Sequence, residues 1–331
     1  MQRVGLRARR RVSVIIVSYN GMPHLEACIS SVLRQTYPNF EVILVDNHST
    51  DGSLEHFRNR FPTVQIVASE TNLGYANGIN KGFEFASGEY IAPLIQDTMV
   101  DPNWLANLVR CLDENPTVGA VTPKILLFHD RDRINTLGLS IHITGIGFAR
   151  ALNQASSQHL GHSLRVAGVS GCSYLIRREI LEQIGGINEN CFMAYDDTDL
   201  SWVVNLLGYD IYCILDSLVY HKFQIKMYPK KFFELECQRP ALLLATLKPG
   251  TFAICFPALV FTEALMAGYC LIRGRAYINA KLKAVSWVYH NWASIKKRRA
   301  KLQKLRAISD LQLLKRLHLN YEWSQLFRIL K

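Results

Sequence analysis

The sequence lacks several signatures that mark common classes of protein. Its 8 cysteines include no Cys-x-x-Cys pair, and no apolar signal-peptide core stands near the N-terminus. These absences argue against a disulfide framework and a structural zinc site, and they leave a reducing cytosol as the expected compartment. No Gly-x-Gly-x-x-Gly follows the first predicted strand, and no Gly-x-x-x-x-Gly-Lys-Ser/Thr occurs. The first absence argues against a dinucleotide-binding Rossmann enzyme, and the second excludes a P-loop NTPase.

Acidic residues are scarce at both ends of the chain. Residues 1–11 carry five arginines and no acid, and residues 273–331 carry 15 lysines or arginines against Asp310 and Glu322. The segment between them holds 18 basic and 25 acidic residues, so the net charge of +11 arises at the ends. Nucleic-acid-binding domains usually concentrate positive charge on the folded body. We therefore expect an anionic membrane surface rather than nucleic acid as partner, and keep nucleic-acid binding by the termini as an alternative.

Apolar residues make up 49% of the 331 residues, which excludes a disordered chain and allows one large domain or two ordinary ones. In the first half, β-rich runs alternate with helical patterns. Strands are expected at 12–17, 41–45, 64–68 and 90–95, with helices at 23–35, 51–61 and 74–86. This alternation predicts an α/β fold with a parallel, doubly wound sheet, whose ligands bind beyond the carboxyl ends of the strands.

The second half begins with residues 118–170, which predict mixed strands and loops. Helices are expected at 175–184 and 199–207, and strands at 210–215 and 218–220 lead to His221. Residues 249–272 then contain a single charge, Glu263, together with Pro257. About 20 apolar residues suffice to span a bilayer, but a Glu and a Pro in mid-segment both weaken that interpretation.

An amphipathic pattern follows this apolar segment. Ile278, Leu282, Val285, Tyr289, Trp292 and Ile295 recur every three or four residues, with lysines beside them. This spacing predicts one helix over 278–295 that lies in a membrane interface. A helix packed on the protein's own body would show the same spacing, so both interpretations stay open.

Asp46 is the first candidate binding residue. It follows the apolar end of the second predicted strand, where a carboxylate can accept hydrogen bonds from a base or a ribose. Ser49 or Asp51 as a helix cap explains part of the same loop without a ligand. A cap does not explain Asp46 itself, because Asp46 directly follows four apolar residues.

Several motifs stand in one order along residues 12–225. In the first half they are Val14 to Gly21 (VIIVSYNG), Val45 to Gly52 (VDNHSTDG), Asn72 to Ala76 (NLGYA) and Asn80-Lys81-Gly82. In the second half they are Ser170-Gly171-Cys172, Leu175 to Glu179 (LIRRE), Gly185-Gly186, Phe192-Met193, Tyr195 to Leu200 (YDDTDL), Trp202 and Val219-Tyr220-His221. Together they resemble the inverting family 2 glycosyltransferases, and most of all the rhamnosyltransferase-like branch.

The resemblance implies a GT-A fold that binds a UDP-, dTDP- or GDP-sugar and transfers the sugar with inversion. It implies donor contacts from Ser18, Tyr19, Asn20, Asp46, Asn72, Gly74, Asn80 and Asp97. The acceptor hydroxyl loses a proton as it attacks, so a carboxylate must lie within hydrogen-bond reach of it. Family position indicates Asp197 as this base, with Asp196 beside it and Asp199 capping or orienting the helix. Three acids favoured by a helix N-terminus are the structural alternative.

The metal motif departs from the family pattern. Where the family usually has Asp-x-Asp or Asn-x-Asp, this chain has Ile95-Gln96-Asp97. Asp97 is a good ligand for a hard cation, whereas Ile95 cannot bind and Gln96 offers only a neutral carbonyl. His221 matches a late family histidine, so Asp97 and His221 are expected to hold Mg²⁺ or Mn²⁺. The site is expected to be weaker, or nearby basic groups to replace part of the metal's role.

The resemblance also suggests an organisation and a location. We expect a basic arm at 1–11, a glycosyltransferase domain at 12–239 and a membrane-associated helical region at 240–331. Within the domain, 12–100 would bind the donor and 101–239 the acceptor, with Trp104 and Trp202 bordering the acceptor sugar. The predicted enzyme works on the cytoplasmic membrane face, peripheral or monotopic with a single span possible, in cell-surface polysaccharide or glycolipid assembly. A non-catalytic nucleotide- or glycan-binding relative with an impaired metal site is the alternative.

Overall fold

The computed structural model describes residues 10–223 and 226–330, with side chains as far as residue 326. Of the predicted basic arm, Arg10 and Arg11 are described: Arg10 lies near Glu89 and Asp113, and Arg11 forms an ion pair with Glu41. Arg3, Arg7 and Arg9 lie outside the described residues. The two described arginines therefore pair with the body's own acids.

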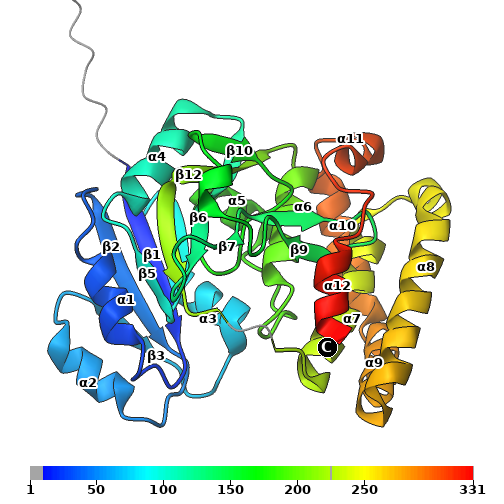
Figure 1. Ribbon diagram of the computed structural model, residues 1–331, viewed down its shortest axis with the longest axis horizontal. Coiled ribbons are helices and arrows are strands. Elements are labelled where there is room, and N and C mark those ends of the chain that lie inside the picture. The colour runs from blue at the N-terminus through cyan, green and yellow to red at the C-terminus, as the bar shows by residue number, and fades with distance from the viewer. Residues whose placement is uncertain (1–9, 224–225, 331) are drawn as a thin grey trace, which may run out of the picture.

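The first half forms the parallel part of a sheet (Figure 1). Strands β1 (Val12–Ser18), β2 (Phe40–Asp46), β3 (Gln65–Ala68) and β4 (Tyr90–Ile95) pair in the order β4-β1-β2-β3, all parallel. Alternate residues of β1 enter two cores: Val14 and Ile16 pack with α1 (Leu25–Val32), whereas Ile15 and Val17 share a core with α3 (Gly74–Phe83). Burial on both faces explains the continuous apolar runs and confirms the predicted α/β class.

The second half extends this sheet in mixed directions. Strand β11 (Leu175–Arg177) runs antiparallel to both β4 and β6 (Val118–Leu127), and β12 (Asp210–His221) is parallel to β6. The predicted helix at 175–184 is therefore a short strand followed by α5 (Arg178–Ile184). The two strands predicted at 210–220 are one strand with an irregularity between Ile214 and Leu218. The sheet is mixed rather than wholly parallel.

Three more strands belong to this sheet: β5 (Thr98–Val100) and β10 (Ser163–Arg165) pair with β12, and β7 (Ile134–Thr136) pairs with β6. Strands β8 (Leu139–Ile141) and β9 (Gly147–Ala149) form a separate pair. The other elements of the body are α2 (Ser53–Arg60), α4 (Trp104–Glu114), the 3₁₀ turn η1 (Ser156–Gln158) and α6 (Asp196–Leu206). The helix predicted at 199–207 thus begins at Asp196. Asp196 and Asp197 consequently lie in its first turn.

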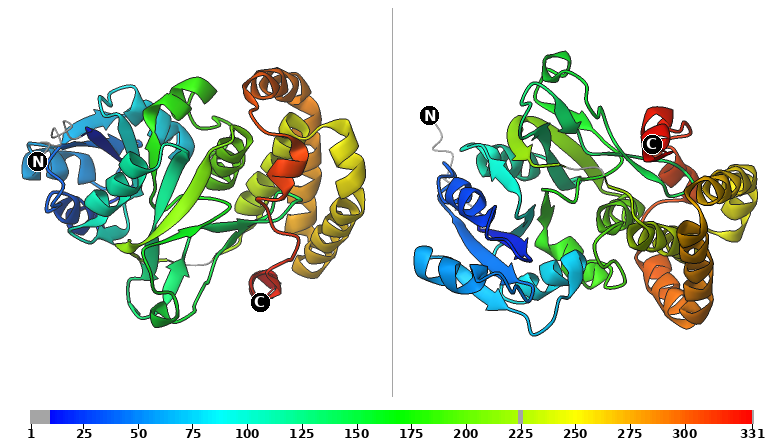
Figure 2. Two further views of the ribbon diagram at one scale, coloured as in Figure 1. Left: turned by 90° about the horizontal axis from the view of Figure 1, so that it is seen from above. Right: turned by 60° about the horizontal axis from the view of Figure 1, so that its bottom comes forward.

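The described part of the C-terminal region is mainly helical and lies at the end of the molecule away from β1 and β2 (Figure 2). Its helices are α7 (Pro229–Thr246), α8 (Pro249–Arg273), α9 (Arg275–His290), α10 (Trp292–Leu305), α11 (Asp310–Leu314) and α12 (Trp323–Leu330). The expected domain boundary at 239/240 falls inside α7, whose Leu242 and Leu243 belong to the main core. This placement corrects the boundary, because residues 240–246 pack with the body.

The prediction of one long amphipathic helix over 278–295 is also wrong. Asn291 separates α9 from α10, with φ −95° and ψ 13°, and its side-chain amide donates to the carbonyl of Trp287 at 2.8 Å. Asparagine competes for backbone hydrogen bonds in this way, which favours a helix end. The predicted stripe is therefore divided between two helices.

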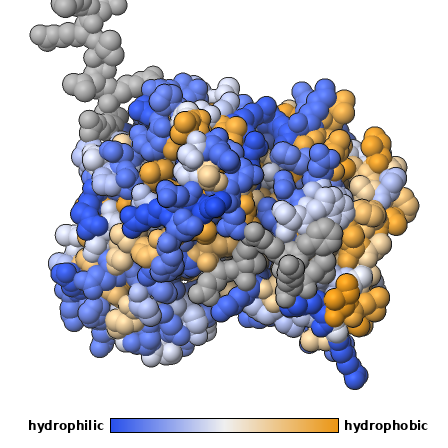
Figure 3. Space-filling model, in the orientation of Figure 1, coloured by the Kyte–Doolittle hydropathy of each residue, from blue (hydrophilic) through white to orange (hydrophobic). Residues whose placement is uncertain are grey.

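Helix α8 is long and apolar enough to cross a membrane by length and composition. Its Glu263, however, pairs with Arg239 of α7 and Lys281 of α9. Apolar side chains of α8 and α9 nevertheless remain exposed. We call the following set the outer apolar surface: Ile254, Phe256, Val260, Phe261, Leu271, Ile272, Leu282, Val285 and Tyr289. Figure 3 shows apolar residues gathered over α8 at the edge of the molecule.

Candidate active site

The carboxyl ends of β1 and β2 lie side by side. Ser18 is the register partner of Asp46, and both side chains are buried. The backbone N–H of Ser49 donates to the Asp46 carboxylate at 3.2 Å. Asn20, at φ 50°, donates its N–H to the Ser49 hydroxyl (2.9 Å) and accepts from the Thr50 N–H (2.8 Å). These bonds hold the two loops in one arrangement at the edge where a parallel sheet binds ligands.

Asn47 is a residue of this site that the sequence analysis did not single out. It is buried, and its amide donates to the Asn72 side chain at 3.0 Å and to the Gly74 carbonyl at 2.9 Å. Its own carbonyl oxygen accepts from the Leu73 N–H at 2.9 Å. Asn47 therefore fixes the loop of Asn72 and Gly74 against the end of β2. In the sequence, its position directly after Asp46 indicates this role.

Gln96 connects β4 to the turn after β1. Its side-chain oxygen accepts from the Ser18 hydroxyl at 2.8 Å and from the Tyr19 N–H at 3.1 Å, and its amide donates to the Tyr19 carbonyl at 3.1 Å. All the polar groups of this side chain are thus engaged. Gln96 therefore holds the turn of Ser18 and Tyr19 in place, and its side-chain oxygen is already engaged in these hydrogen bonds.

Asp97 and His221 lie together at the end of β4 and β12. The Asp97 Oδ1 atom is buried without a hydrogen-bond partner among the described residues, and it lies 3.4 Å from His221 Nε2. The other ring nitrogen of His221, Nδ1, is 2.9 Å from the Asn135 side-chain oxygen. A buried carboxylate oxygen without a donor, beside an imidazole nitrogen oriented by a second side chain, fits a place for a divalent cation.

The charge state of His221 depends on this contact. Burial lowers the pKa of His221, but the Cys172 sulfur and the Asp97 carboxylate outweigh burial and raise it to about 10. The ring is therefore protonated at neutral pH, and a cation that bound here would have to displace this proton. The described residues contain no group of three His, Cys, Asp or Glu side chains that would enclose a metal ion. Asp97 and His221 would therefore supply only part of a coordination shell.

Asp196 and Asp197 occupy the first turn of α6. Tyr195 precedes them with φ 76°, a left-handed conformation that is costly for a residue with a side chain, and its hydroxyl donates to the Gly145 carbonyl at 2.7 Å. Asp197 accepts from the Gly171 N–H at 3.1 Å and from the Thr198 N–H at 2.6 Å. Asp196 keeps one buried oxygen without a hydrogen-bond partner in the described chain. The strained turn therefore presents two adjacent carboxylates, of which Asp196 is buried and Asp197 is partly buried.

Both carboxyl groups hold protons more tightly than usual. Burial and the neighbouring charge of Asp197 raise the pKa of Asp196 to about 8. Burial also raises the pKa of Asp197, although hydrogen bonds from Gly171 and Thr198 and the charge of Lys231 oppose this. A desolvated pair of like charges releases its protons in two coupled steps, at higher pH than an ordinary carboxyl group. Such a pair has the protonation range of a general base.

Asp199 has a different role from its two neighbours. Its carboxylate accepts from Arg298 of α10 in a bidentate pair, at 2.8 Å and 2.5 Å, and from Asn188 at 3.2 Å. Both partners come from outside α6. Asp199 therefore orients the helix through a charged contact with the C-terminal region.

A cavity of about 550 Å³ opens beside the acid pair. Asp196, Asp197, His221 and Asn135 line it together with Lys231 and with apolar residues of α7, α8 and α12. This volume falls within the roughly 300–1,000 Å³ of small-molecule sites. The predicted base and the predicted metal ligand His221 therefore face one common space.

Three other predicted site residues do not line this cavity. Trp104 and Trp202 are both 0% exposed and sit in hydrophobic cores, so neither ring can stack on an acceptor sugar, which corrects that prediction. Asn80 bonds through both ends of its amide to the backbone of Ile187, at 2.8 Å each. Asn80 thus joins α3 to the loop before α6, and its donor contact stays a prediction without a free polar atom to support it.

A family model matches this chain over residues 13–185, and its description is glycosyl transferase family 2. An uncharacterized glycosyltransferase of Haemophilus influenzae is 34% identical over 113 residues, which are 33% of this chain and 35% of that protein. The poly-beta-1,6-N-acetyl-D-glucosamine synthase of Staphylococcus epidermidis is 29% identical over 60% of this chain and 47% of its own length. The chain therefore spans less than half the length of these curated relatives.

A third relative is matched over more of its length. The N-acetylglucosaminyl-diphospho-decaprenol L-rhamnosyltransferase of Mycobacterium tuberculosis is 28% identical over 232 residues, which are 63% of this chain and 75% of that protein. The rhamnosyltransferase-like resemblance of the sequence motifs thus has a counterpart among the relatives.

Solved structures show the same fold. S. aureus TarS 1–349 in complex with UDP-GlcNAc has a TM-score of 0.57 at 17% identity and covers 89% of each chain. The mannosyltransferase PcManGT from Pyrobaculum calidifontis in complex with GDP-Man and Mn²⁺ has a TM-score of 0.54 at 20% identity, covering 90% of this chain and 87% of that one. These likenesses confirm the predicted GT-A type of fold.

Proposed function

The chain belongs to glycosyltransferase family 2, and we propose that it is an inverting transferase of cell-surface polysaccharide or glycolipid assembly. It moves a sugar from a UDP-, dTDP- or GDP-sugar to a hydroxyl of a glycan or a lipid-linked acceptor. The observation that carries this proposal is the adjacent pair of Asp196, which is buried, and Asp197, which is partly buried; both line a 550 Å³ cavity shared with His221. An acid pair beside a ligand-sized cavity is the arrangement that proton abstraction requires.

Asp197 is the proposed general base. The acceptor oxygen attacks the anomeric carbon as the bond from that carbon to the diphosphate oxygen breaks, and the hydroxyl proton passes to the Asp197 carboxylate. Hydrogen bonds from Gly171 and Thr198 fix the direction of this carboxylate. Oδ1 accepts from both the N–H and the hydroxyl of Thr198, whereas Oδ2 accepts only from the Gly171 N–H and keeps a lone pair for the acceptor hydroxyl. Asp196, beside it, raises the proton affinity of the pair.

The donor nucleotide would lie at the ends of β1 and β2. Ser18, Tyr19, Asn20 and Asp46 line this edge, and Asn72 and Gly74 border it from the next loop. Gly74 has φ 78°, and a Cβ atom there would lie 2.2 Å from the Phe192 carbonyl oxygen, so no other residue fits. Complexes of structural neighbours with UDP-GlcNAc and GDP-Man support a nucleotide-sugar donor.

Asp97 and His221 are the proposed ligands of a divalent cation, Mg²⁺ or Mn²⁺. Such a cation, when bound, neutralises charge on the departing diphosphate. Neighbouring structures that contain Mn²⁺ support this assignment. Lys231, which lines the same cavity, is placed to contribute positive charge without a metal.

The outer apolar surface is the proposed membrane contact, on the cytoplasmic face. It comes from α8 and α9, and Lys283 lies exposed beside Leu282. Apolar side chains next to cations are typical of helices that lie in the interface. Because Glu263 is paired within the helical region, an interfacial position explains α8 better than a full span.

Asp197→Asn tests the base. Because a positioned base contributes about 10²–10⁴-fold, this variant should lose transfer by that factor and still bind the nucleotide sugar in calorimetry. Asp132→Asn, which removes an exposed carboxylate, is the matched control and should keep full activity. Full turnover by Asp197→Asn would refute the assignment, and a complete lack of transfer by the wild-type protein would favour a non-catalytic relative.

Asp97→Ala tests the metal ligand separately. Transfer at limiting Mn²⁺ should require a higher metal concentration in this variant than in the wild type, since one of the two oxygen or nitrogen ligands is lost. Full wild-type activity in EDTA would show instead that the diphosphate is stabilised without a metal.

A further inference from the structure

The cavity beside Asp197 changes character from one end to the other. Its polar end is formed by Asn135, Asp196, Asp197 and His221. The lining contributed by the C-terminal helices α7, α8 and α12 also contains Lys231, Glu236 and Arg239, but it is mostly apolar. We call its apolar residues the apolar end: Phe232, Leu235, Leu265, Met266, Tyr269 and Leu326. A donor nucleotide cannot account for this apolar end, because Ser18 and Asp46 lie outside the cavity lining and a diphosphate would not compensate apolar walls.

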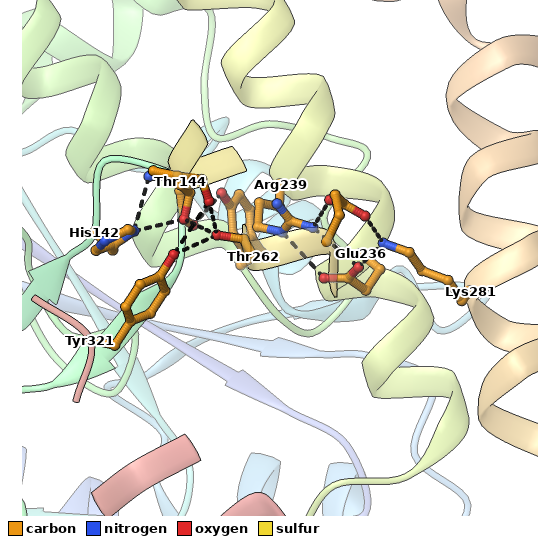
Figure 4. A network of polar contacts seen from close by, with 11 residues as sticks. His142, Thr144, Glu236, Arg239, Thr262, Lys281 and Tyr321 are labelled. Carbon is orange, nitrogen blue, oxygen red and sulfur yellow. Dashed lines mark hydrogen bonds and ion pairs between the residues drawn. The ribbon is translucent and has the colours of Figure 1, made fainter. Parts of the chain in front are cut away.

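Polar contacts join the helices around this cavity to one another (Figure 4). Arg239 of α7 pairs with Glu236 at 3.2 Å and with Glu263 of α8 at 2.6 Å, and Lys281 of α9 contacts both glutamates. This cluster contains two acids and two bases, so it presents no net charge to the cavity. It therefore offers no preference for an anion and serves to join α7, α8 and α9.

A second contact fixes the inner side of α8. The Thr262 hydroxyl lies 3.1 Å from the Thr144 hydroxyl and 2.7 Å from the Tyr321 hydroxyl, and the Tyr321 ring stacks on His142 at 4.0 Å. Leu265, Met266 and Tyr269 follow within the next two turns of the same helix. Polar contacts thus fix α8 at the rim, while the apolar walls beyond them enclose open volume. Apolar walls in a cavity of this size favour an occupant that buries apolar surface against them.

We propose that this apolar end binds the hydrocarbon chain of an amphipathic acceptor, whose hydroxyl-bearing sugar lies at Asp197. The proposal rests on the proposed function and narrows its acceptor to the lipid-linked class. Helix α8 connects the cavity with the outer apolar surface. Leu265 and Met266 line the cavity, whereas Phe261 and Leu271 of the same helix belong to the outer apolar surface. A chain held in a membrane interface can therefore pass along one helix into the site.

A series of soluble alkyl glucosides tests the hydrocarbon site. Methyl, butyl, hexyl and octyl β-D-glucoside, all below their micelle concentrations, are titrated into the full-length protein in a calorimeter. Each buried methylene should tighten binding about fourfold until the chain fills the cavity. Equal affinities across the series, or no binding of the octyl compound, would overturn the proposal.

Two variants on α8 separate the cavity from the outer apolar surface. Met266→Glu puts a carboxylate into the cavity and should weaken octyl glucoside binding at least tenfold. Ala267→Glu adds the same charge at the next, exposed residue and should leave binding unchanged. If both variants bind alike, the chain lies on the outer surface and the proposal fails. Met266→Trp, which fills the cavity without a charge, should shorten the chain length at which affinity levels off, and it covers the case in which Met266→Glu does not fold.

Failure of this proposal can be distinguished from failure of the proposed function. Asp197→Asn should lose sugar transfer and keep the chain-length dependence, because the chain does not contact Asp197. Normal transfer with no chain-length dependence overturns only the hydrocarbon site. A chain-length dependence without any sugar transfer overturns the proposed function and the acceptor role together, and leaves only a lipid-binding site.

Discussion

Helices α6 and α10 both carry ionisable side chains that are buried or partly buried, and the surroundings of these side chains differ. In α6, Asp197 accepts only from backbone and hydroxyl groups, and Asp196 keeps an oxygen without a partner; within residues 10–326 neither forms an ion pair. In α10, Arg298 pairs with Asp199, and Arg299 donates to the carbonyls of Leu244 and Leu247 at 2.6 Å each.

This contrast separates charges that are kept for chemistry from charges that hold the fold. A buried charge without a partner costs stability and persists where a reaction needs it. A paired one orders the elements that it joins. Two partly buried arginines of the C-terminal region belong to the second kind: Arg306 pairs with Asp310, and Arg316 donates to the carbonyl of Tyr209. The basic tail is therefore in part an internal scaffold rather than wholly a membrane anchor.

The largest expected effect on stability comes from removing the partner of a paired charge. Arg298→Met leaves the Asp199 carboxylate buried and unpaired, so it should lower the free energy of unfolding by about 3 kcal/mol. Urea denaturation measures this change. Lys297→Met, at the exposed neighbouring residue, should change stability by less than about 0.5 kcal/mol. The double variant Arg298→Met/Asp199→Asn should recover most of the loss, and equal losses in the single and double variants would contradict a charge effect.

Removing an acid that has no ion-pair partner should instead raise the free energy of unfolding. The pKa of Asp196 is raised to about 8 in the folded protein, so the folded state binds more protons than the unfolded state, and stability falls as pH rises from about 4 to about 8. Asp196→Asn removes this penalty and should stabilise the protein at pH 8 by on the order of 2 kcal/mol. Thermal unfolding at pH 5 and at pH 8 measures it. A stabilisation that is no larger at pH 8 would show that the acid is not protonated in the fold.

The pH profile of transfer follows from the same pair. Burial raises the pKa of both acids, and the base must be deprotonated to accept the acceptor proton. Transfer measured as kcat/KM should therefore rise by up to about tenfold per pH unit below neutrality and level off near the upper pKa of the pair. In Asp196→Asn the plateau should begin at lower pH, since the neighbouring charge is gone. A flat profile from pH 5 to pH 8 in the wild type would exclude the acid pair as the base.

The smallest expected effect concerns exposed cations of the tail. Lys283→Ala should weaken binding to vesicles that contain phosphatidylserine by about fivefold, because each lysine near an anionic surface contributes about 1 kcal/mol. Flotation at physiological salt measures this. Arg58→Ala, an exposed cation on α2 far along the chain, is the control and should not change binding. If the two variants float alike, Lys283 does not face the membrane.

Local patterns predicted the donor half well. Alternation of apolar strands with helices placed Ser18 and Asp46 at one sheet edge, because period and length distinguish these elements without distant contacts. The acid run Asp196 to Asp199 was recognised from its motif, and its placement on the first turn of a helix follows from that motif's acids.

Long-range partners were beyond the sequence. Arg298 lies 99 residues from Asp199, and no spacing rule connects them. In the sequence, Arg298 therefore looks like one more cation on an exposed helix face rich in lysine and arginine. Trp104 and Trp202 failed for a related reason: an aromatic residue after a polar run fits a binding surface or a core equally well, and only the packing of α4 and α6 against the sheet decides. The directions of β11 and the break at Asn291 likewise depend on tertiary contacts.

The seam between α3 and the loop before α6 has a consequence for engineering. Tyr75 donates its N–H to the Phe192 carbonyl, Asn77 donates to the Glu189 carbonyl at 2.9 Å, and Asn80 binds Ile187 at both ends of its amide. A chimera that exchanges the donor half for that of a relative would place foreign residues on one side of this seam. Parents that differ at residues 75–80 or 187–192 should therefore be recombined with both segments taken from the same parent.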